Sequence, residues 1–428
     1  MHSPFDLLAG TCALRDPEGA DHVDGVPARV IASPRDVGEV SALLRACSAH
    51  NLAVVVRGRG SKLTWGHPPE RVDVLLETTA LDQLVEHSRG DLIATAGSGM
   101  PLARFQEHLA DGGHQVVVDD LAHDTAAPTS TPATRGSTLG GAMATNVAGP
   151  RRLWTGALRD LIIGVRFVRA DGTLAKAGGK VVKNVAGYDL AKLLTGSYGT
   201  LAVITEVTVR LHPLPAASAW VGTSVEPGRL DRVLATVIGS QLVPTAVELR
   251  VRPGVPAAVV TMLSGTTEGV QARATALQQV LTDLGCDARV HDAPPPWWAS
   301  LLHPGQRGGQ APPDETRPVL VRATARLSGV GALARQIERV GGTAVGSAGV
   351  GVLHTTLPAD DAAPAAVSSL RELTGSLGGS CVVLDAPPEL RPRLDTWGPV
   401  PGLDLMRRVK AEFDPGRILA PGRFVGGI

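Results

Sequence analysis

Aromatic side chains are scarce in this sequence: tryptophan, tyrosine and phenylalanine together make up 3% of its 428 residues, against 43% hydrophobic residues overall. Aliphatic side chains must therefore fill the core. The four cysteines, Cys12, Cys47, Cys286 and Cys381, form no C-x-x-C pair and no metal-binding spacing. We expect no disulfide framework and no cysteine metal site, as is typical of a reducing compartment.

The sequence also lacks an excess of charge and a long apolar run. Basic and acidic residues number 41 each, so a surface for a nucleic-acid backbone is not expected. No apolar segment approaches the roughly 18 residues of a spanning helix, and residues 1–20 lack the basic flank and apolar stretch of a secretory signal. These absences predict a cytoplasmic protein without nucleic-acid partners, whose association with any membrane is made through partner subunits.

Hydrophobic patterning divides the chain into two units. In the first, a strand over 28–32 is followed by a helix for which Ser33 is the expected N-cap. Alternating apolar residues over 161–169 and 201–209 predict half-buried antiparallel strands. The proline-rich segment 212–215 ends this pattern and predicts a domain boundary.

The second unit contains an internal repeat. A strand-helix-strand-strand-helix-strand series over 219–291 recurs over 319–384, after a connector rich in proline and glycine. Each copy is typical of a ferredoxin-like unit. The fold class is therefore predicted as α+β, with the second unit a cap of two ferredoxin-like βαββαβ halves that form one antiparallel sheet.

Two glycine-rich segments of the first unit could bind a phosphate or a flat ligand. Arg57-Gly58-Arg59-Gly60-Ser61 follows a strand, so its backbone N–H groups and its arginines could hold a pyrophosphate. Segment 138–146 brings consecutive small residues together with Thr and Asn, which lets a main chain lie against a ligand. An ordinary glycine turn is the alternative for the first segment, and tight helix packing is the alternative for the second.

These segments resemble the FAD-binding proteins of the vanillyl-alcohol oxidase/p-cresol methylhydroxylase (PCMH) family. The resemblance also rests on 149–152, on Lys183-Asn-Val-Ala-Gly-Tyr-Asp189 and on Pro421-Gly-Arg423. It covers nearly the whole chain and is strongest from residue 28 to residue 213. Within the family, the sequence is most similar to the smaller FAD-binding subunit of bacterial glycolate oxidases.

The resemblance implies a two-subdomain PCMH-type FAD-binding domain at 1–213, a cap at 214–390, and a C-terminal segment, 391–428, that returns to the first domain. It implies that substrate hydride passes to FAD N5 and that the electrons then leave to a partner. The residues implied to bind the cofactor are Arg57, Gly58, Arg59, Gly60, Ser61, Gly66, Ser137, Thr138, Leu139, Gly140, Gly141, Thr145, Asn146, Val203 and Ile204.

Candidate catalytic residues lie on predicted strands of the cap. Glu248 and Arg250 share one face of a strand, and Arg322 stands among apolar residues of another. An arginine there could hold a substrate carboxylate through a bidentate pair, while a salt bridge at the rim is the alternative. His354 is interpreted as structural, and no metal motif is found in the cap.

The predicted activity is that of an FAD-dependent oxidoreductase acting on CH–OH groups, as the FAD-binding subunit of a complex that oxidises glycolate or another D-2-hydroxyacid. The expected partners are a larger flavoprotein subunit and an iron–sulfur subunit. Two alternatives stay open. The chain could be a non-catalytic FAD scaffold or electron relay, or it could be a self-sufficient flavin oxidoreductase with a different substrate.

The glycine-rich loop predicts that FAD is bound non-covalently. Some relatives link the flavin to a histidine in this loop, and residues 57–65 contain no histidine. Acid precipitation of the purified yellow protein should therefore release all of its flavin into the supernatant, as measured by absorbance. Flavin retained in the denatured pellet would contradict the prediction.

Overall fold

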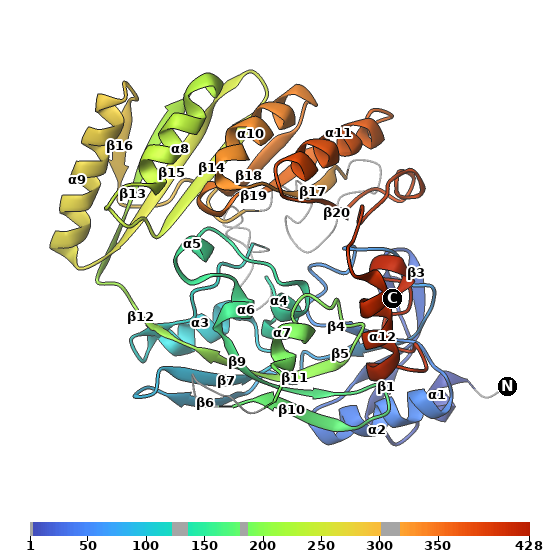
Figure 1. Ribbon diagram of the computed structural model, residues 1–428. Helices are drawn as coiled ribbons and strands as arrows, with labels where there is room; N and C mark the ends of the chain where they lie inside the picture. The colour runs from blue at the N-terminus through green and yellow to red at the C-terminus, as the bar shows by residue number, and fades with distance from the viewer. Residues whose placement is uncertain (1–2, 122–135, 180–186, 301–316) are drawn as a thin grey trace.

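The computed structural model describes residues 3–121, 136–179, 187–300 and 317–428. Lys183 and Asn184 of the sequence motif lie outside the described residues. The described chain forms an N-terminal half with two five-stranded sheets and a cap with an eight-stranded sheet (Figure 1). None of the helices in these ranges has the length and apolar character that crossing a membrane requires.

The first sheet has a parallel centre. Its strands run in the order β1 (Ala13–Arg15), β3 (Val26–Ser33), β5 (Val72–Glu77) and β4 (Val54–Arg57), with β2 (His22–Val23) also paired to β3. Helix α2 (Val37–Ala49) connects β3 to β4. The prediction that this helix begins after Ser33 is wrong. Asp36 caps it by accepting a hydrogen bond from the Glu39 N–H (2.9 Å), whereas Ser33 stays in β3 and donates to Glu77.

The second sheet is antiparallel. Its order is β10 (Leu174–Gly178), β9 (Ile162–Val168), β11 (Val203–Arg210), β7 (Ile93–Gly97) and β6 (Leu84–Ser88). One face packs on α3 (Leu102–Ala110), α4 (Leu139–Thr145) and α7 (Leu190–Leu194). The expectation that β9 is only half-buried is wrong at Val168, because this side chain lies on the face opposite Val165 and Phe167 and packs with α2 in the core of the first sheet.

The cap confirms the predicted repeat. Its sheet runs in the order β16 (Ala288–His291), β13 (Ala217–Val225), β15 (Val255–Gly265), β14 (Ala246–Arg252), β18 (Thr343–Ser347), β19 (Val352–Leu357), β17 (Val319–Thr324) and β20 (Cys381–Asp385). Every pairing is antiparallel. Within each half the strands are ordered as in a ferredoxin-like unit, and β14 joins β18 at the centre.

One face of the cap sheet is covered by its own helices. These are α8 (Leu230–Ile238), α9 (Thr267–Asp283), α10 (Val330–Arg339) and α11 (Ala363–Ser376), which Figure 1 shows on the side away from the N-terminal half. Because side chains alternate along a strand, Val247 and Leu249 of β14 enter the core beneath these helices. Glu248 and Arg250 therefore point to the opposite face, toward the N-terminal half.

The C-terminal segment returns to the first sheet. After α12 (Leu403–Phe413), Leu419 pairs in parallel with Val54 of β4. The Val54 N–H donates to Ile418 O (2.7 Å), and the Ala420 N–H donates to Val54 O (2.8 Å). The last residues thus extend a sheet whose other strands come from the first 77 residues. The division into domains at 213 and 390 stays a prediction.

Arg391 joins the cap to the loop that follows β4. Its guanidinium donates to the carbonyl oxygens of Thr64 and Gly66, both at 2.7 Å, and to the Asp385 carboxylate at 2.9 Å. It also forms an ion pair with Asp24 (3.1 Å) in the turn before β3. One side chain therefore contacts the β2–β3 turn, the loop after β4 and the end of the cap sheet.

Lys410 of α12 is buried at the contact between the C-terminal segment and the N-terminal half. Its ammonium donates to Thr200 O (2.7 Å), Leu419 O (2.8 Å) and the Asp414 carboxylate (2.7 Å). Asp414, with no exposed surface, also accepts hydrogen bonds from the Ile418 and Leu419 N–H groups. This pair fixes the path of the segment that reaches β4.

Replacement of Lys410 by methionine should lower the free energy of unfolding by about 3–5 kcal/mol, because the Asp414 charge would be left buried without its partner. Denaturant unfolding of the variant measures the loss. Arg408→Met, an exposed change on the same helix, is the control and should be nearly neutral. Equal stability of the two variants would contradict a stabilising role for Lys410.

Candidate cofactor and substrate site

The loop 57–61 begins where β4 ends, and Arg57 anchors its first residue. The Arg57 guanidinium pairs with Asp21 (2.6 Å) and Glu77 (2.5 Å), so it points away from the rest of the loop. Hydrogen bonds from Arg15 and then Arg57 hold the pKa of the Asp21 carboxyl well below its usual value. Gly60 has a φ of +77°, a conformation that favours glycine.

The second wall of the site is α4, whose N-cap is Thr138. The Thr138 hydroxyl accepts a hydrogen bond from the Gly141 N–H (3.1 Å). A Cβ atom at Gly140 would lie 2.7 Å from the Cβ of Ser98, so only glycine permits this approach of α4 to the turn after β7. The sequence had left helix packing open for this segment, and the structure shows that packing.

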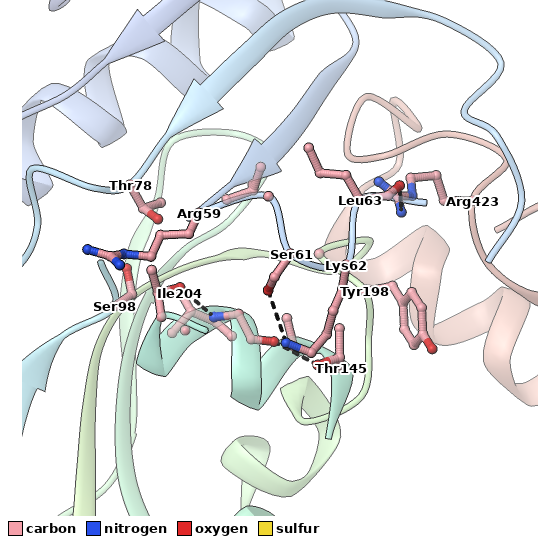
Figure 2. Close-up of a pocket in the computed structure, with 18 of the residues that line it drawn as sticks. Arg59, Ser61, Lys62, Leu63, Thr78, Ser98, Thr145, Tyr198, Ile204 and Arg423 are labelled. Atoms are coloured by element: carbon pink, nitrogen blue, oxygen red, sulfur yellow. Dashed lines mark hydrogen bonds between the residues drawn. The ribbon is translucent and has the colours of Figure 1, made fainter. Parts of the chain in front are cut away.

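Between these walls lies a pocket of about 750 Å³, named here the glycine-loop pocket. Its lining residues are Val56, Gly58, Arg59, Gly60, Ser61, Lys62, Leu63, Thr78, Ser98, Thr138, Gly140, Gly141, Ala144, Thr145, Tyr198, Gly199, Ala202, Ile204 and Arg423. Figure 2 shows Arg59, Thr78 and Ser98 at one end, and Tyr198 and Arg423 at the other.

The structure brings nine of the predicted cofactor residues to this pocket: Gly58, Arg59, Gly60, Ser61, Thr138, Gly140, Gly141, Thr145 and Ile204. Six others do not line it: Arg57, Gly66, Ser137, Leu139, Asn146 and Val203. Leu139 and Val203 are core residues, Asn146 ends α4 in a left-handed conformation, and Gly66 packs against the backbone of Arg423. Their assignment to the cofactor stays a prediction.

Lys62 is a buried cation in the wall of the glycine-loop pocket. It was not among the cofactor residues predicted from the sequence. Only 8% of its surface is exposed, and its ammonium donates to the hydroxyls of Ser61 and Ser137. Ser137 in turn donates to Asp120 (2.8 Å). Burial lowers the pKa of Lys62, with Asp120 acting in the opposite direction. No spacing in the sequence signals this network, because Lys62 and Ser137 are 75 residues apart.

Arg423 closes the other end of the pocket. It donates to the carbonyl oxygens of Leu63 (2.8 Å) and Trp65 (2.7 Å), and burial lowers its pKa to about 10. The ring of Tyr198 contacts Trp397 and Phe424. The sequence motif that contains Arg423 was recognised, but its place in the pocket was not predicted. Arg423 reaches the pocket only because the C-terminal segment folds back onto β4.

The pocket contains buried polar atoms that need a partner. In the described part of the chain, Ser98 Oγ and Arg423 Nε have no hydrogen-bond partner. Buried polar atoms are nearly always paired, so a ligand with polar groups suits these positions. The glycine-lined walls allow its close approach to the main chain. These features fit FAD, and no lining residue is a histidine or cysteine that could link it covalently.

A second group of polar side chains lies on the cap face that points toward the N-terminal half. Arg322 of β17 and His354 of β19 are directly opposite each other in the sheet. Arg322 is also close enough to Tyr198 of the glycine-loop pocket and to Arg152 to influence the pKa values of both. Among the described residues, Arg322 has no ion pair or side-chain hydrogen bond. The predicted alternative of a rim salt bridge is therefore not observed.

The other two predicted catalytic residues have different surroundings. Glu248 is buried, with 2% of its surface exposed, and its pKa is raised well above the ordinary value, first by burial and then by Asp119. Arg250 instead lies over the ring of Trp297, with its guanidinium carbon 5.0 Å from the ring centroid. The structure thus brings Glu248 and Arg322 to the region around Arg152 and places Arg250 against the tryptophan. Their catalytic roles stay predictions.

Comparisons with known proteins identify part of the N-terminal half. Residues 28–178 match the family model of the FAD binding domain. The chain is 28% identical to glycolate oxidase subunit GlcD of Bacillus subtilis (strain 168), over 93% of this chain and 89% of that protein. It is 34% identical to glycolate oxidase subunit GlcE of Escherichia coli (strain K12), over 39% of this chain and 44% of that protein.

The fold agrees with this match. The structure of p-cresol methylhydroxylase with substrate bound superposes with a TM-score of 0.65 at 17% sequence identity, over 98% of this chain and 92% of that one. The chain therefore carries a PCMH-type FAD-binding domain, and FAD is its cofactor. It is an FAD-dependent oxidoreductase related to the glycolate oxidase subunits GlcD and GlcE, which confirms the resemblance seen in the sequence.

Among the described residues, no group of three or more His, Cys, Asp or Glu side chains is placed to hold a metal ion. All four cysteines are free, and Cys47, Cys286 and Cys381 are buried.

The burial of His354 predicts an acid sensitivity of folding. Burial, followed by the charges of Arg322 and Arg152, lowers the pKa of His354 from 6.5 to about 3. Below pH 6.5 the unfolded chain therefore binds a proton that the folded chain does not. The free energy of unfolding consequently decreases as the pH is lowered. From pH 8 to pH 5 this group alone should remove about 2 kcal/mol.

Unfolding of the native chain and of His354→Gln at both pH values isolates this contribution, since other titrating groups, Glu248 included, are common to both proteins. The free energy of unfolding of the native chain, relative to that of His354→Gln, should be about 2 kcal/mol lower at pH 5 than at pH 8. His50→Gln, at an exposed histidine, is the control. A difference independent of pH would show that His354 titrates normally in the folded protein.

Proposed function

We propose that this chain is the FAD-binding subunit of a complex that oxidises glycolate or a related D-2-hydroxyacid. The observation that carries the proposal is the pair Arg322 and His354, opposite each other on the cap face. Directly opposite residues of an antiparallel pair have Cβ atoms about 4.5–5.5 Å apart. This separation suits a ligand whose carboxylate and hydroxyl stand on adjacent carbons.

Each member of the pair would have a distinct role. The Arg322 guanidinium, free of ion pairs within the described chain, would bind the substrate carboxylate through two parallel N–H···O bonds. His354 is neutral at physiological pH because its pKa is about 3, so a ring nitrogen can accept a hydrogen bond from the substrate hydroxyl and orient it. Bound FAD would supply the hydride acceptor of the oxidation.

The proposal assigns the cofactor to the glycine-loop pocket. Loop 58–61 and Thr138–Gly141 would hold the pyrophosphate through backbone N–H groups, and Arg423 and Tyr198 would lie at the end nearest Arg322. The influence of Arg322 on the pKa of Tyr198 supports the closeness of the two sites. Lys62, buried beside Ser61, would add positive charge near the phosphates.

Replacing Arg322 by methionine tests the carboxylate site. FAD content should stay unchanged, while the dissociation constant of the 2-hydroxyacid in anaerobic flavin reduction should rise about 10- to 150-fold, as expected for the loss of 1.5–3 kcal/mol from a charge-assisted hydrogen bond. Arg326→Met, at an exposed arginine just after β17, is the control. Unchanged reduction by an Arg322→Met preparation loaded with FAD would assign Arg322 to structure.

The assembly with a larger flavoprotein subunit and an iron–sulfur subunit is also a proposal. Its support is that both GlcD and GlcE, the relatives named above, are subunits of a glycolate oxidase. The His354 pKa favours the same view, because a histidine with so low a pKa is a weak base and leaves proton removal incomplete in this chain.

Co-expression with these two partners should give a complex that co-purifies and oxidises glycolate much faster than this chain alone. The expected reason is that the partners supply the missing base and the electron acceptor. Purified single chain and purified complex are compared with the same dye as terminal acceptor. Equal turnover would favour the self-sufficient enzyme, and a chain whose flavin no 2-hydroxyacid reduces would favour the scaffold or relay.

A further inference from the structure

Tyr198 lines the glycine-loop pocket in a backbone conformation that residues with a side chain rarely adopt. Its φ is +56°, and among the described lining residues, glycines aside, it alone has a positive φ. For a bulky residue this conformation is strained, and such strain collects at functional sites. Figure 2 shows the Tyr198 side chain at the end of the pocket away from Arg59.

The strained conformation is held by the end of α4. The Tyr198 N–H donates to Ala144 O (2.9 Å), and the Gly196 N–H donates to Met143 O (2.9 Å). The last carbonyl groups of a helix have no partner within the helix, so these two bonds satisfy them. Gly196, with a φ of +80°, lets the chain enter this turn. The turn therefore fixes the direction in which the Tyr198 side chain leaves the backbone.

The ring of Tyr198 is also held by its neighbours. Its centroid lies 5.6 Å from that of Trp397 and 5.5 Å from that of Phe424. The ring packs in addition against the apolar cluster to which Leu320 and Val382 of the cap belong. Tyr198 therefore stands at the boundary between the glycine-loop pocket and the cap.

The cap residues of this cluster flank Arg322. Leu320 precedes Arg322 by two positions on β17, so both side chains point to the same face of the sheet. Val382 of β20 is directly opposite Arg322. Packing against this cluster brings the Tyr198 side chain close to Arg322, and the effect of Arg322 on the pKa of Tyr198 agrees with that position.

The Tyr198 hydroxyl is a donor with no hydrogen-bond partner among the described residues. Burial raises the pKa of the phenol, with Arg322 and Arg423 acting in the opposite direction, so the hydroxyl keeps its proton at neutral pH. Arg322 likewise has no ion pair within the described ranges. Two donors without acceptors thus lie close together, and an anion with two acceptor oxygens would satisfy both.

We propose that the Tyr198 hydroxyl donates a hydrogen bond to the same substrate carboxylate that Arg322 binds. The proposal rests on the proposed function and adds to it a specificity-determining residue from the N-terminal half, one that favours 2-hydroxyacids over uncharged alcohols. A hydrogen bond to an ionised oxygen is about twice as strong as one between neutral groups. Because Tyr198 lines the glycine-loop pocket, the same bond holds the substrate against the cofactor site.

Replacement of Tyr198 by phenylalanine tests the proposal, because it removes the hydroxyl and keeps the ring. In anaerobic flavin reduction, the dissociation constant of glycolate or D-lactate should rise about tenfold or more, as expected for a hydrogen bond to a charged group. FAD content should stay unchanged. Tyr188→Phe, at the other tyrosine, which is 92% exposed, is the control and should behave as the native chain. Loss of FAD from Tyr198→Phe would assign the hydroxyl to the cofactor and overturn the proposal.

Titration with 2-hydroxyisobutyrate adds a measurement that needs no turnover, since this acid has no hydrogen on C2 to transfer. Its binding, followed by flavin absorbance, should weaken in Tyr198→Phe and in Arg322→Met, whereas binding of its uncharged amide should change in neither. In the double variant the two losses should combine to less than their product, because both groups bind one carboxylate. Losses that multiply, or an amide weakened as much as the acid, would overturn the proposal.

Failure of this proposal is distinguishable from failure of the proposed function. If glycolate or D-lactate reduces Tyr198→Phe with the native constant, the role of Tyr198 is overturned and hydroxyacid oxidation stands. If neither acid reduces the native flavin, hydroxyacid oxidation is overturned, and the titration judges Tyr198 separately. Binding of 2-hydroxyisobutyrate that depends on Tyr198 then supports a carboxylate site, and equal binding by the native chain and Tyr198→Phe contradicts it.

Discussion

The structure depends on the charge contacts that bring the C-terminal segment to the loop after β4. Arg391 and Arg423 come from the C-terminal segment, and both donate to backbone carbonyls of residues 63–66. Carbonyl oxygens bound by a guanidinium cannot change position independently of it, so the loop is held in one conformation. The glycine-loop pocket and the cap are therefore positioned by the same side chains, and their relative placement does not rely on apolar packing alone.

Apolar packing supports this arrangement where cap and N-terminal half meet. Trp65, Leu121 and Val147 pack against Leu320, Val382 and Leu384 of the cap. These aliphatic and aromatic contacts lie at the junction of the two parts. Burial is the largest cause of the pKa shifts of Glu248 and His354 on the cap face, and a low-dielectric setting of this kind strengthens any pairing of Arg322 with an anion.

The sequence was most informative where a pattern is local. The repeat in the cap was predicted, strand by strand, because β-strands and amphipathic helices differ in period, whereas the order of its eight strands comes from the structure. The loop at 57–61 was recognised because its two glycines lie close together in the sequence.

The start of α2 was misplaced because Ser33 and Asp36 are both good N-cap residues, and the choice between them depends on the hydrogen bond of Ser33 to Glu77. The ion pairs of Arg57 with Asp21 and Glu77 were not foreseen for a similar reason, since both carboxylates are distant from it in sequence. Lys62 was missed as a site residue because what distinguishes it is burial, which no sequence pattern encodes.

The pairing of Leu419 with Val54 has a consequence for the order of folding. The strand partner of β4 and the Arg423 side chain that closes the pocket are far along the chain from the segments they contact, by 360 residues for Arg423 and Leu63. Contacts between such distant parts of a chain form late and slowly, since loop closure must precede them. The first sheet is therefore completed late in folding, and the FAD site takes its final form only when residues 419–423 have returned to β4 and the loop that follows it.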